Sequence, residues 1–195
     1  MVMGALLAAR LAARESDGMS ADELARFNKL TAAAAREELL ACCNSAAWAD
    51  RMASGRPYSS ALDAARQSSA IVARLTVADL EAALAAHPRI GERKHEAQPT
   101  GQGSARSAQW SKREQAGVAD SDSETALALA ESNLEYERRF GHIYLVCASG
   151  KTGSQLLALL RARLRNTPAT EWQVVRTELQ KINEIRLRDL LAGTP

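Results

Sequence analysis

Apolar residues recur every three or four positions along most of this chain, which is the spacing of an amphipathic helix. Glycine and proline interrupt the pattern, as at Gly55 with Pro57 and again at Gly141. The pattern predicts helices over residues 31–43, 45–53, 60–74, 76–86, 122–140, 152–165 and 168–191. Because the connections between them are short, we expect neighbouring helices to pack antiparallel.

Particular side chains refine these predictions. Thr76 and Asp79 have the spacing of a capping box, so a helix should begin there and deliver the chain to His87. Pro168 suits the first turn of the last helix. The apolar side of the 122–140 helix is predicted to contain Leu127, Leu129 and Leu134. The core stripe of the last helix is predicted to be Trp172, Val175, Leu179 and Ile182.

Two segments depart from the helical pattern. Residues 94–109 contain Pro99, Gly101 and Gly103 without an apolar period, which predicts a loop, followed by a helix over 107–116. Residues 143–147 are rich in β-branched and aromatic side chains and follow a glycine. We therefore expect a buried, extended segment there, whose backbone amides can face a ligand.

Composition indicates the fold class. The chain has 195 residues, of which 46% are hydrophobic but only 4% aromatic, and alanine and leucine dominate. This favours an all-α fold, a single-domain compact bundle of several helices with the active site between helices. Ser20 and Glu23 have capping-box spacing beside Met19, so we expect the helical domain over 19–195 and an N-terminal extension, not necessarily native, over 1–18.

The charge balance and the cysteines limit the classes of binding partner and the cellular setting that we expect. There are 25 basic and 23 acidic residues, so no broad field favours nucleic acid or an anionic membrane, and a small-molecule partner fits better. No apolar run is long enough to span a bilayer. Cys42, Cys43 and Cys147 contain no C-x-x-C pair, which indicates a reducing, cytoplasmic setting.

Polar chemistry is concentrated in two short stretches. His87 precedes Pro88, which holds it out of the α region where a helix should end and a loop begin. The helix dipole at that end favours the charged imidazolium. Ser111 lies three residues before Glu114 and four before Gln115, so the three side chains should share one helix face. Taken singly, these residues are more typical of helix caps and solvated surfaces than of catalysis.

The order of these motifs is more specific than either alone. His87-Pro88, then Ser111 with Glu114-Gln115, then a long helix ending in Phe140-Gly141, resembles the 2-oxo-4-hydroxy-4-carboxy-5-ureidoimidazoline (OHCU) decarboxylases of urate breakdown. The likeness extends from about Met19 to the C-terminus. It departs from the family over residues 1–18, over 94–109, and at His142, where relatives often carry an apolar residue.

The resemblance implies an activity and a set of site residues. It implies cofactor-independent decarboxylation of OHCU to (S)-allantoin and carbon dioxide, without a metal, by a homodimer. His87 would transfer the proton, and Glu114 would be catalytic or would hold the substrate or the imidazole in register. Substrate would be bound by Pro88, Ser111, Lys112, Arg113, Glu114, Gln115, Ile143, Tyr144, Leu145, Val146 and Cys147.

Two other functions remain open from the residues themselves. A metal-dependent hydrolase would use His87, Glu92 and His95, although their spacing lacks the one-face geometry of H-E-x-x-H. A helical interaction module without enzymatic activity would use the same motifs only as caps and solvated faces. Replacing His87 by alanine discriminates between the decarboxylase and the interaction module.

Overall fold

The computed structural model describes residues 21–91, 102–119 and 121–193, and every regular element within these ranges is a helix. The all-α prediction is therefore confirmed. The predicted extension over 1–18 and the boundary at Met19 lie outside the described residues. A first helix covers residues 21–29. It is followed by α2 (Ala32–Cys42), α3 (Ala46–Ser54), α4 (Ala61–Val72), α5 (Val77–Leu84), α6 (Gln102–Glu114), α7 (Ala116–Ala119), α8 (Ser123–Phe140), α9 (Gly153–Arg163) and α10 (Pro168–Ala192).

Polar side chains fix the starts of most helices. At the start of α2, α3, α4, α5, α8, α9 and α10, the side chain of the preceding residue accepts a hydrogen bond from a backbone N–H in the first turn, which typically contributes about 1 kcal/mol of stability. The capping box of Thr76 and Asp79 is formed as predicted. Gly141, with φ 77°, ends α8 in the left-handed conformation that glycine favours. The capping residues are Thr31, Ser45, Ser60, Thr76, Asp122, Thr152 and Thr167.

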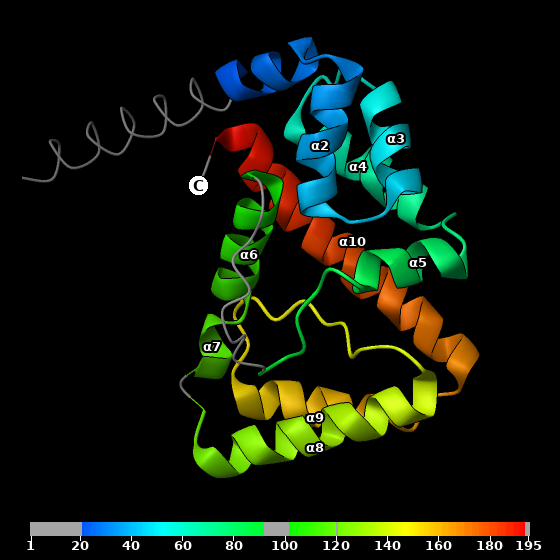
Figure 1. Cartoon of the computed structure of the whole chain (residues 1–195), viewed down its shortest axis with the longest axis vertical. Coiled ribbons are helices and arrows are strands. Elements are labelled where there is room, and N and C mark those ends of the chain that lie inside the picture. Colours follow the sequence, from blue (N-terminus) through cyan, green and yellow to red (C-terminus); the bar gives the residue numbers. More distant parts are fainter. Residues whose placement is uncertain (1–20, 92–101, 120, 194–195) are drawn as a thin grey trace, which may run out of the picture.

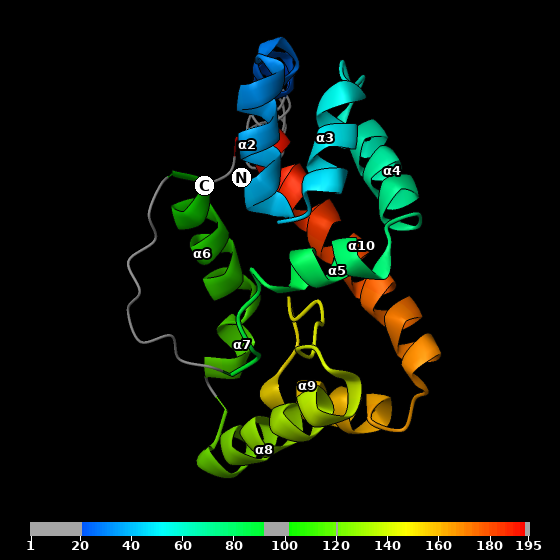
Figure 2. The ribbon, with the colours of Figure 1, turned by 45° about the vertical axis from the view of Figure 1, so that its right-hand side comes forward.

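The long helix α10 runs through the whole molecule and joins its two ends (Figure 1). At one end it packs with α2, α3 and α4 around a core that includes Leu39, Trp48 and Leu179. At the other end α8 and α9 lie side by side and enclose a second core around Leu129 and Leu156. The 45° turn in Figure 2 shows the segment between α8 and α9 rising toward α5, between these two ends. None of the described helices has the length and hydrophobicity needed to cross a bilayer.

The predicted loop over 94–109 is wrong from residue 102 onward, because α6 already begins at Gln102. Residues 102–109 contain no apolar side chain larger than alanine, so hydrophobic periodicity cannot indicate a helix there. Alanine, arginine and glutamine nevertheless have high helix propensity, and Trp110 anchors the helix in the core. Residues 94–101 lie outside the described part of the chain.

The predicted apolar side of α8 is also wrong in part. Leu129 is buried, but Leu127 and Leu134 are 67% and 58% exposed. The buried side of α8 instead carries Leu129, Ser132, Asn133 and Tyr136. Because two of these four residues are polar, the hydrophobic pattern alone pointed to the wrong side. In α10 the predicted stripe of Val175, Leu179 and Ile182 is buried, with Trp172 partly buried against the same core.

Candidate active site

His87 stands where α5 ends, as the proline after it predicted. The chain makes one further turn beyond Leu84, and the His87 N–H donates to the Leu84 carbonyl at 2.9 Å. This turn delivers His87 and Pro88 to a small cavity of about 20 Å³ between α5, α6, α10 and the segment after α8. Its lining residues are His87, Pro88, Ile90, Ser111, Glu114, Gln115, Tyr144, Leu145, Val146, Ala148 and Ile182.

The polar face of α6 contributes Ser111, Glu114 and Gln115, and the structure brings all three to the cavity. The Gln115 Oε1 accepts a hydrogen bond from the Gly91 N–H at 3.1 Å. Gly91 has φ 80°, a conformation that side-chain-bearing residues rarely adopt. Gln115 therefore holds the loop after His87 in place while its amide N–H₂ stays available to a ligand.

Glu114 is held by a buried arginine from α10. The Arg186 Nε and Nη2 donate to the two carboxylate oxygens of Glu114 at 2.7 and 2.8 Å. The same guanidinium donates to the Cys42 carbonyl at 3.1 Å and lies near the Ser111 hydroxyl at 3.4 Å. Side-chain exposure is 3% for Arg186 and 12% for Glu114. The pair is thus largely desolvated, and its two-point geometry fixes the direction of the Glu114 carboxylate.

Arg186 holds the predicted site residue Glu114, although the sequence patterns did not place Arg186 in the site. It lies four residues after Ile182, which lines the cavity, and both belong to the buried side of α10. A charged residue within an apolar helical stripe was one signal, since buried charges require partners, and the family resemblance of residues 183–187 was another. Ile90, Ala148 and Ile182 were also missed, because small and aliphatic lining residues cannot be told from core residues by sequence.

The fourth wall of the cavity is the extended segment after α8. Residues 143–148 form no helix, and Tyr144 to Ala148 are buried, which confirms the predicted buried segment. Tyr144, Leu145, Val146 and Ala148 line the cavity. Ile143 and Cys147 do not. The Cys147 N–H is engaged by Glu178 at 2.8 Å, and Ile143 packs against the larger core.

The structure separates Lys112 and Arg113 from the other predicted binding residues. Both are exposed, and Arg113 pairs with Asp189 at the far end of α10. The reason is the helical period. Ser111, Glu114 and Gln115 share one face of α6, and the two residues between them point to another. Lys112 and Arg113 do not line the cavity, and their contact with the substrate stays a prediction.

His87 is neutral in its folded environment, which corrects the expectation that the helix end favours imidazolium. Burial, together with the smaller effect of the nearby Arg186 charge, lowers the pKa of His87 from its ordinary 6.5 to about 3. The helix dipole contributes only about 0.3–1 kcal/mol at exposed sites, so desolvation outweighs it. An uncharged imidazole can accept a proton when an anion binds beside it.

Comparison with known proteins shows the family of the chain. The family model described as OHCU decarboxylase matches residues 28–188, most of the chain. The chain belongs to the OHCU decarboxylase family. It is 32% identical over 163 residues to the uric acid degradation bifunctional protein of Arabidopsis thaliana, covering 80% of this chain and 47% of that protein. It thus spans about half the length of that relative.

Other members of the decarboxylase family match over a larger share of their own length. The chain is 29% identical to the OHCU decarboxylase of Amia calva over 138 residues, 71% of this chain and 76% of that protein. A crystal structure of an OHCU decarboxylase in the presence of (S)-allantoin superimposes with a TM-score of 0.66 at 28% identity, covering 80% of this chain and 97% of that one. The fold class and the family are therefore shown by both sequence and structure.

Within the described part of this family member, no three histidine, cysteine, aspartate or glutamate residues are grouped to hold a metal ion. Glu92 and His95 of the alternative metal site lie outside the described residues.

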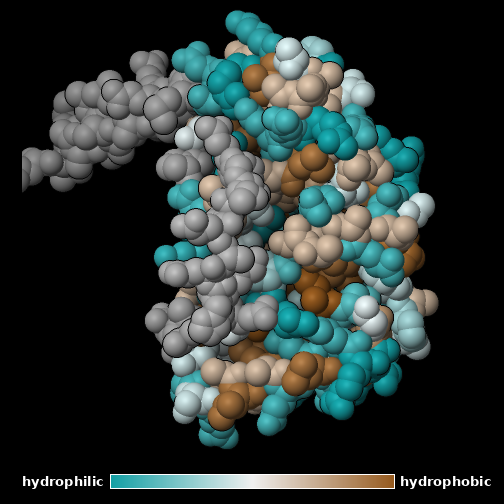
Figure 3. Space-filling view, viewed as in Figure 1, coloured by the Kyte–Doolittle hydropathy of each residue, from teal (hydrophilic) through white to brown (hydrophobic). Residues whose placement is uncertain are grey.

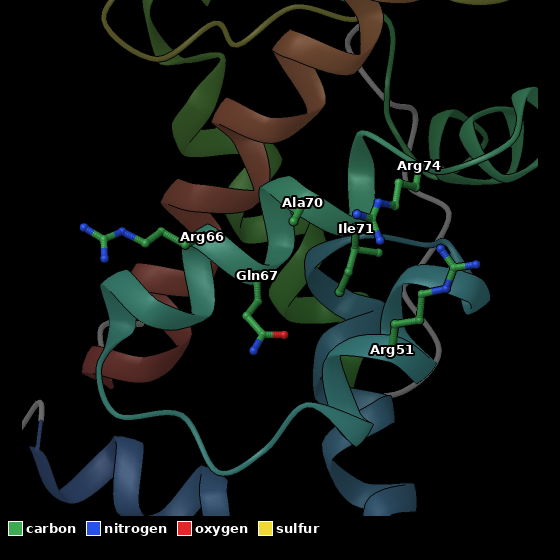
Figure 4. A pocket seen from close by; sticks show the side chains of 6 residues that line it. All are labelled: Arg51, Arg66, Gln67, Ala70, Ile71 and Arg74. Carbon is green, nitrogen blue, oxygen red and sulfur yellow. The ribbon is translucent and has the colours of Figure 1, made fainter.

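A larger cavity of about 590 Å³ lies against α3 and α4, lined by Arg51, Arg66, Gln67, Ala70, Ile71 and Arg74 (Figure 4). It contains no proton-transfer group, and Arg66 points away from the others. The smaller cavity is the better candidate.

The neutral state of His87 predicts that acid destabilises the protein. A histidine whose pKa is lowered on folding binds fewer protons in the folded than in the unfolded state, so its contribution is present above pH 6.5 and is lost as pH falls toward 3. From pH 7 to pH 5 the expected loss is about 2 kcal/mol. Urea unfolding at both pH values measures it, and His87→Gln should lose correspondingly less. Equal losses in the two proteins would contradict the assignment.

Proposed function

We propose that this chain catalyses the cofactor-independent decarboxylation of OHCU to (S)-allantoin and carbon dioxide in urate degradation. The observation that carries the proposal is the cavity in which a neutral His87 and an Arg186-paired Glu114 lie together. Relatives in Amia calva and Mus musculus are named OHCU decarboxylases, and a solved relative was crystallised in the presence of (S)-allantoin. The residues of the cavity, their arrangement and the named relatives thus all support OHCU decarboxylation.

The reaction needs only a proton and an oriented substrate. Cleavage of the bond between the ring carbon and the carboxylate releases carbon dioxide, and the electron pair moves into the adjoining carbon–nitrogen double bond. The electron-rich intermediate then takes up one proton, which balances the charge of the lost carboxylate. His87 acquires that proton when the anionic substrate binds, because the substrate's charge raises the pKa of the imidazole, and delivers it to one face. Delivery from one side sets the (S) configuration.

The remaining side chains orient the substrate. Each Glu114 oxygen accepts one bond from Arg186 and has a second lone pair for a ring or ureido N–H. Ser111 and Gln115 recognise polar atoms of the ring and ureido group, and Pro88 forms one wall. The backbone of Tyr144, Leu145 and Val146 supplies further hydrogen bonds. Ile143 and Cys147 act only through the shape of this segment.

The test follows the handedness of the product. OHCU is generated fresh, and circular dichroism records allantoin formation with and without the protein. Spontaneous decay should give racemic allantoin, whereas the protein should produce the (S) signal rapidly. Identical traces with and without the protein would overturn the proposed function. The non-enzymatic interaction module predicts that result.

We also propose that the enzyme is a cytoplasmic homodimer. The three cysteines are all free and buried, in keeping with a reducing compartment. Leu127 and Leu134 lie seven residues apart on one face of α8 and are exposed, as is Leu159 on α9. Figure 3 shows apolar surface over this end of the molecule. Exposed leucines two helical turns apart on one face are typical of a surface that another copy covers.

Removing the apolar character of this face should separate the two copies. We expect the wild-type protein to have the mass of a dimer and the double variant Leu127→Glu/Leu134→Glu to have the mass of a monomer, because a charge at each position would be buried in the interface. Light scattering after size-exclusion chromatography measures both. Leu62→Glu on α4, also 58% exposed, is the matched control and should leave the dimer intact. A monomeric wild type would contradict the assignment.

A further inference from the structure

The extended segment that forms one wall of the cavity is not held by a sheet or a helix. It connects α8 to α9, and its residues from Tyr144 to Ala148 are buried. A buried backbone outside regular structure needs hydrogen-bond partners from elsewhere, because unpaired peptide groups are costly to bury. Two buried charged side chains provide such partners, one on each side of Val146.

The first is Arg163, at the C-terminal end of α9. Its Nη1 donates to the Leu145 carbonyl at 2.6 Å, and its guanidinium lies 4.7 Å from the centre of the Tyr144 ring. Arg163 is only 7% exposed, and its Nε donates to the fully buried Glu171 carboxylate at 2.7 Å. The Tyr136 hydroxyl donates to the same carboxylate. The Arg163 guanidinium is thus held in place by Glu171 while it donates to the extended segment.

The second is Glu178, on the buried side of α10. Its Oε2 accepts from the Cys147 N–H at 2.8 Å, while its Oε1 accepts from Lys181 at 2.6 Å. Glu178 is 8% exposed, and Lys151 donates to the carbonyl of the same Cys147 at 2.6 Å. The residue before Val146 and the residue after it are therefore both held by charge-assisted hydrogen bonds, which are the strong class.

Val146 itself remains unpaired between these two anchors. It is 6% exposed and lines the cavity, yet neither its N–H nor its carbonyl is bonded to any group of the described residues. Because most buried peptide groups are paired, an unpaired one in a cavity wall is suited to a ligand. Its direction depends on the peptides on either side, which Arg163 and Glu178 hold.

We infer that Arg163 and Glu178 are positioning residues for the decarboxylation, which fix the Leu145–Cys147 backbone so that the Val146 peptide group meets the substrate. The inference rests on the proposed function. Neither residue lines the cavity, so each acts through the wall and not on the substrate. A substrate held less firmly by this wall presents both faces to the proton donor, and the product loses handedness.

The first variant is Arg163→Gln, with Arg161→Gln as its matched control. Arg161 lies on the same helix two residues earlier and is exposed. We expect Arg163→Gln to raise KM, to lower kcat by about tenfold or more, since small displacements of an oriented substrate are costly, and to give allantoin of reduced (S) excess. The control should match the wild type in all three. A folded Arg163→Gln that retains the wild-type values would overturn the role of Arg163.

A second pair of variants covers the case in which Arg163→Gln fails to fold because the buried Glu171 loses its cation. Glu178→Gln keeps an oxygen that can accept from the Cys147 N–H, whereas Glu178→Leu removes it. Glu178→Leu should lower kcat and (S) excess, and Glu178→Gln should restore both to near the wild-type values. Equal behaviour of the two variants would contradict positioning through this hydrogen bond.

The wild-type arm separates this inference from the proposed function. If the wild-type protein produces no (S)-allantoin, the proposed function is wrong, and the inference falls with it. If the wild type is active and stereoselective while the folded variants are too, the function stands and the positioning role is wrong. Amide hydrogen exchange at Cys147, faster in Glu178→Leu than in Glu178→Gln, verifies that the wall was loosened.

Discussion

Replacing His87 by alanine is expected to lower kcat/KM for OHCU by about 10²–10⁴-fold, the usual contribution of a positioned proton-transfer group. His87 is the one described titratable side chain of the cavity that is uncharged at neutral pH and able to take up a proton. Its removal leaves the substrate to collect a proton from water on either face. Circular dichroism should therefore show allantoin forming slowly and as a racemate.

A folding control makes this result interpretable. His87 makes no side-chain hydrogen bond among the described residues, so His87→Ala should unfold near the wild-type temperature at pH 7. His142→Gln changes a histidine outside the cavity, whose ring packs at a tilt against Trp172 with ring centroids 4.3 Å apart, and should retain activity. Full activity and (S) selectivity in a folded His87→Ala would remove His87 from the mechanism.

Replacing Arg186 by methionine should abolish measurable activity and destabilise the protein by about 3–5 kcal/mol, the usual effect of removing one partner of a buried ion pair. The substitution leaves the Glu114 carboxylate buried without its two donors and the Cys42 carbonyl without one. Glu114 would then no longer face the substrate in a fixed direction. Urea unfolding and the allantoin assay measure the two effects separately.

The chain offers a matched control on the same helix. Arg188 pairs with Glu184 four residues earlier, but its side chain is 65% exposed, so Arg188→Met should change stability by less than about 1 kcal/mol and leave activity intact. Adding Glu114→Gln to Arg186→Met removes the unpaired charge and should recover part of the lost stability but none of the activity. A stable, active Arg186→Met would show that the pair is dispensable.

Helix positions were predictable from the sequence because their signals are local. Thr76 with Asp79 and the Gly141 stop mark boundaries through hydrogen bonds that span only a few residues. The start of α6 was not predictable in the same way, since residues 102–109 contain no large apolar side chain. The exposure of Leu127 and Leu134 depends on which side of α8 the polar Asn133 and Ser132 occupy, which only tertiary packing decides.

In the candidate site, too, the residues with local signals were predictable and those that depend on long-range contacts were not. His87, Ser111, Glu114 and Gln115 were identifiable because a proline and a helical period constrain them locally. Arg186 lies 72 residues from its partner Glu114, and no short-range pattern connects the two. The pKa of His87 was misjudged for a related reason. A helix end is visible in sequence, whereas burial and a distant cation are properties of the fold.

The order of the chain has a consequence for the newly synthesised protein. His87, Glu114 and the wall at Val146 all precede α10, which supplies Glu171, Glu178, Ile182 and Arg186. Until that helix leaves the ribosome, Glu114 has no counter-ion and Arg163 no carboxylate. Nascent chains shorter than about Arg186 should therefore expose the buried polar groups of the site to chaperones and proteases, and catalytic competence should arrive in a single step with the docking of α10.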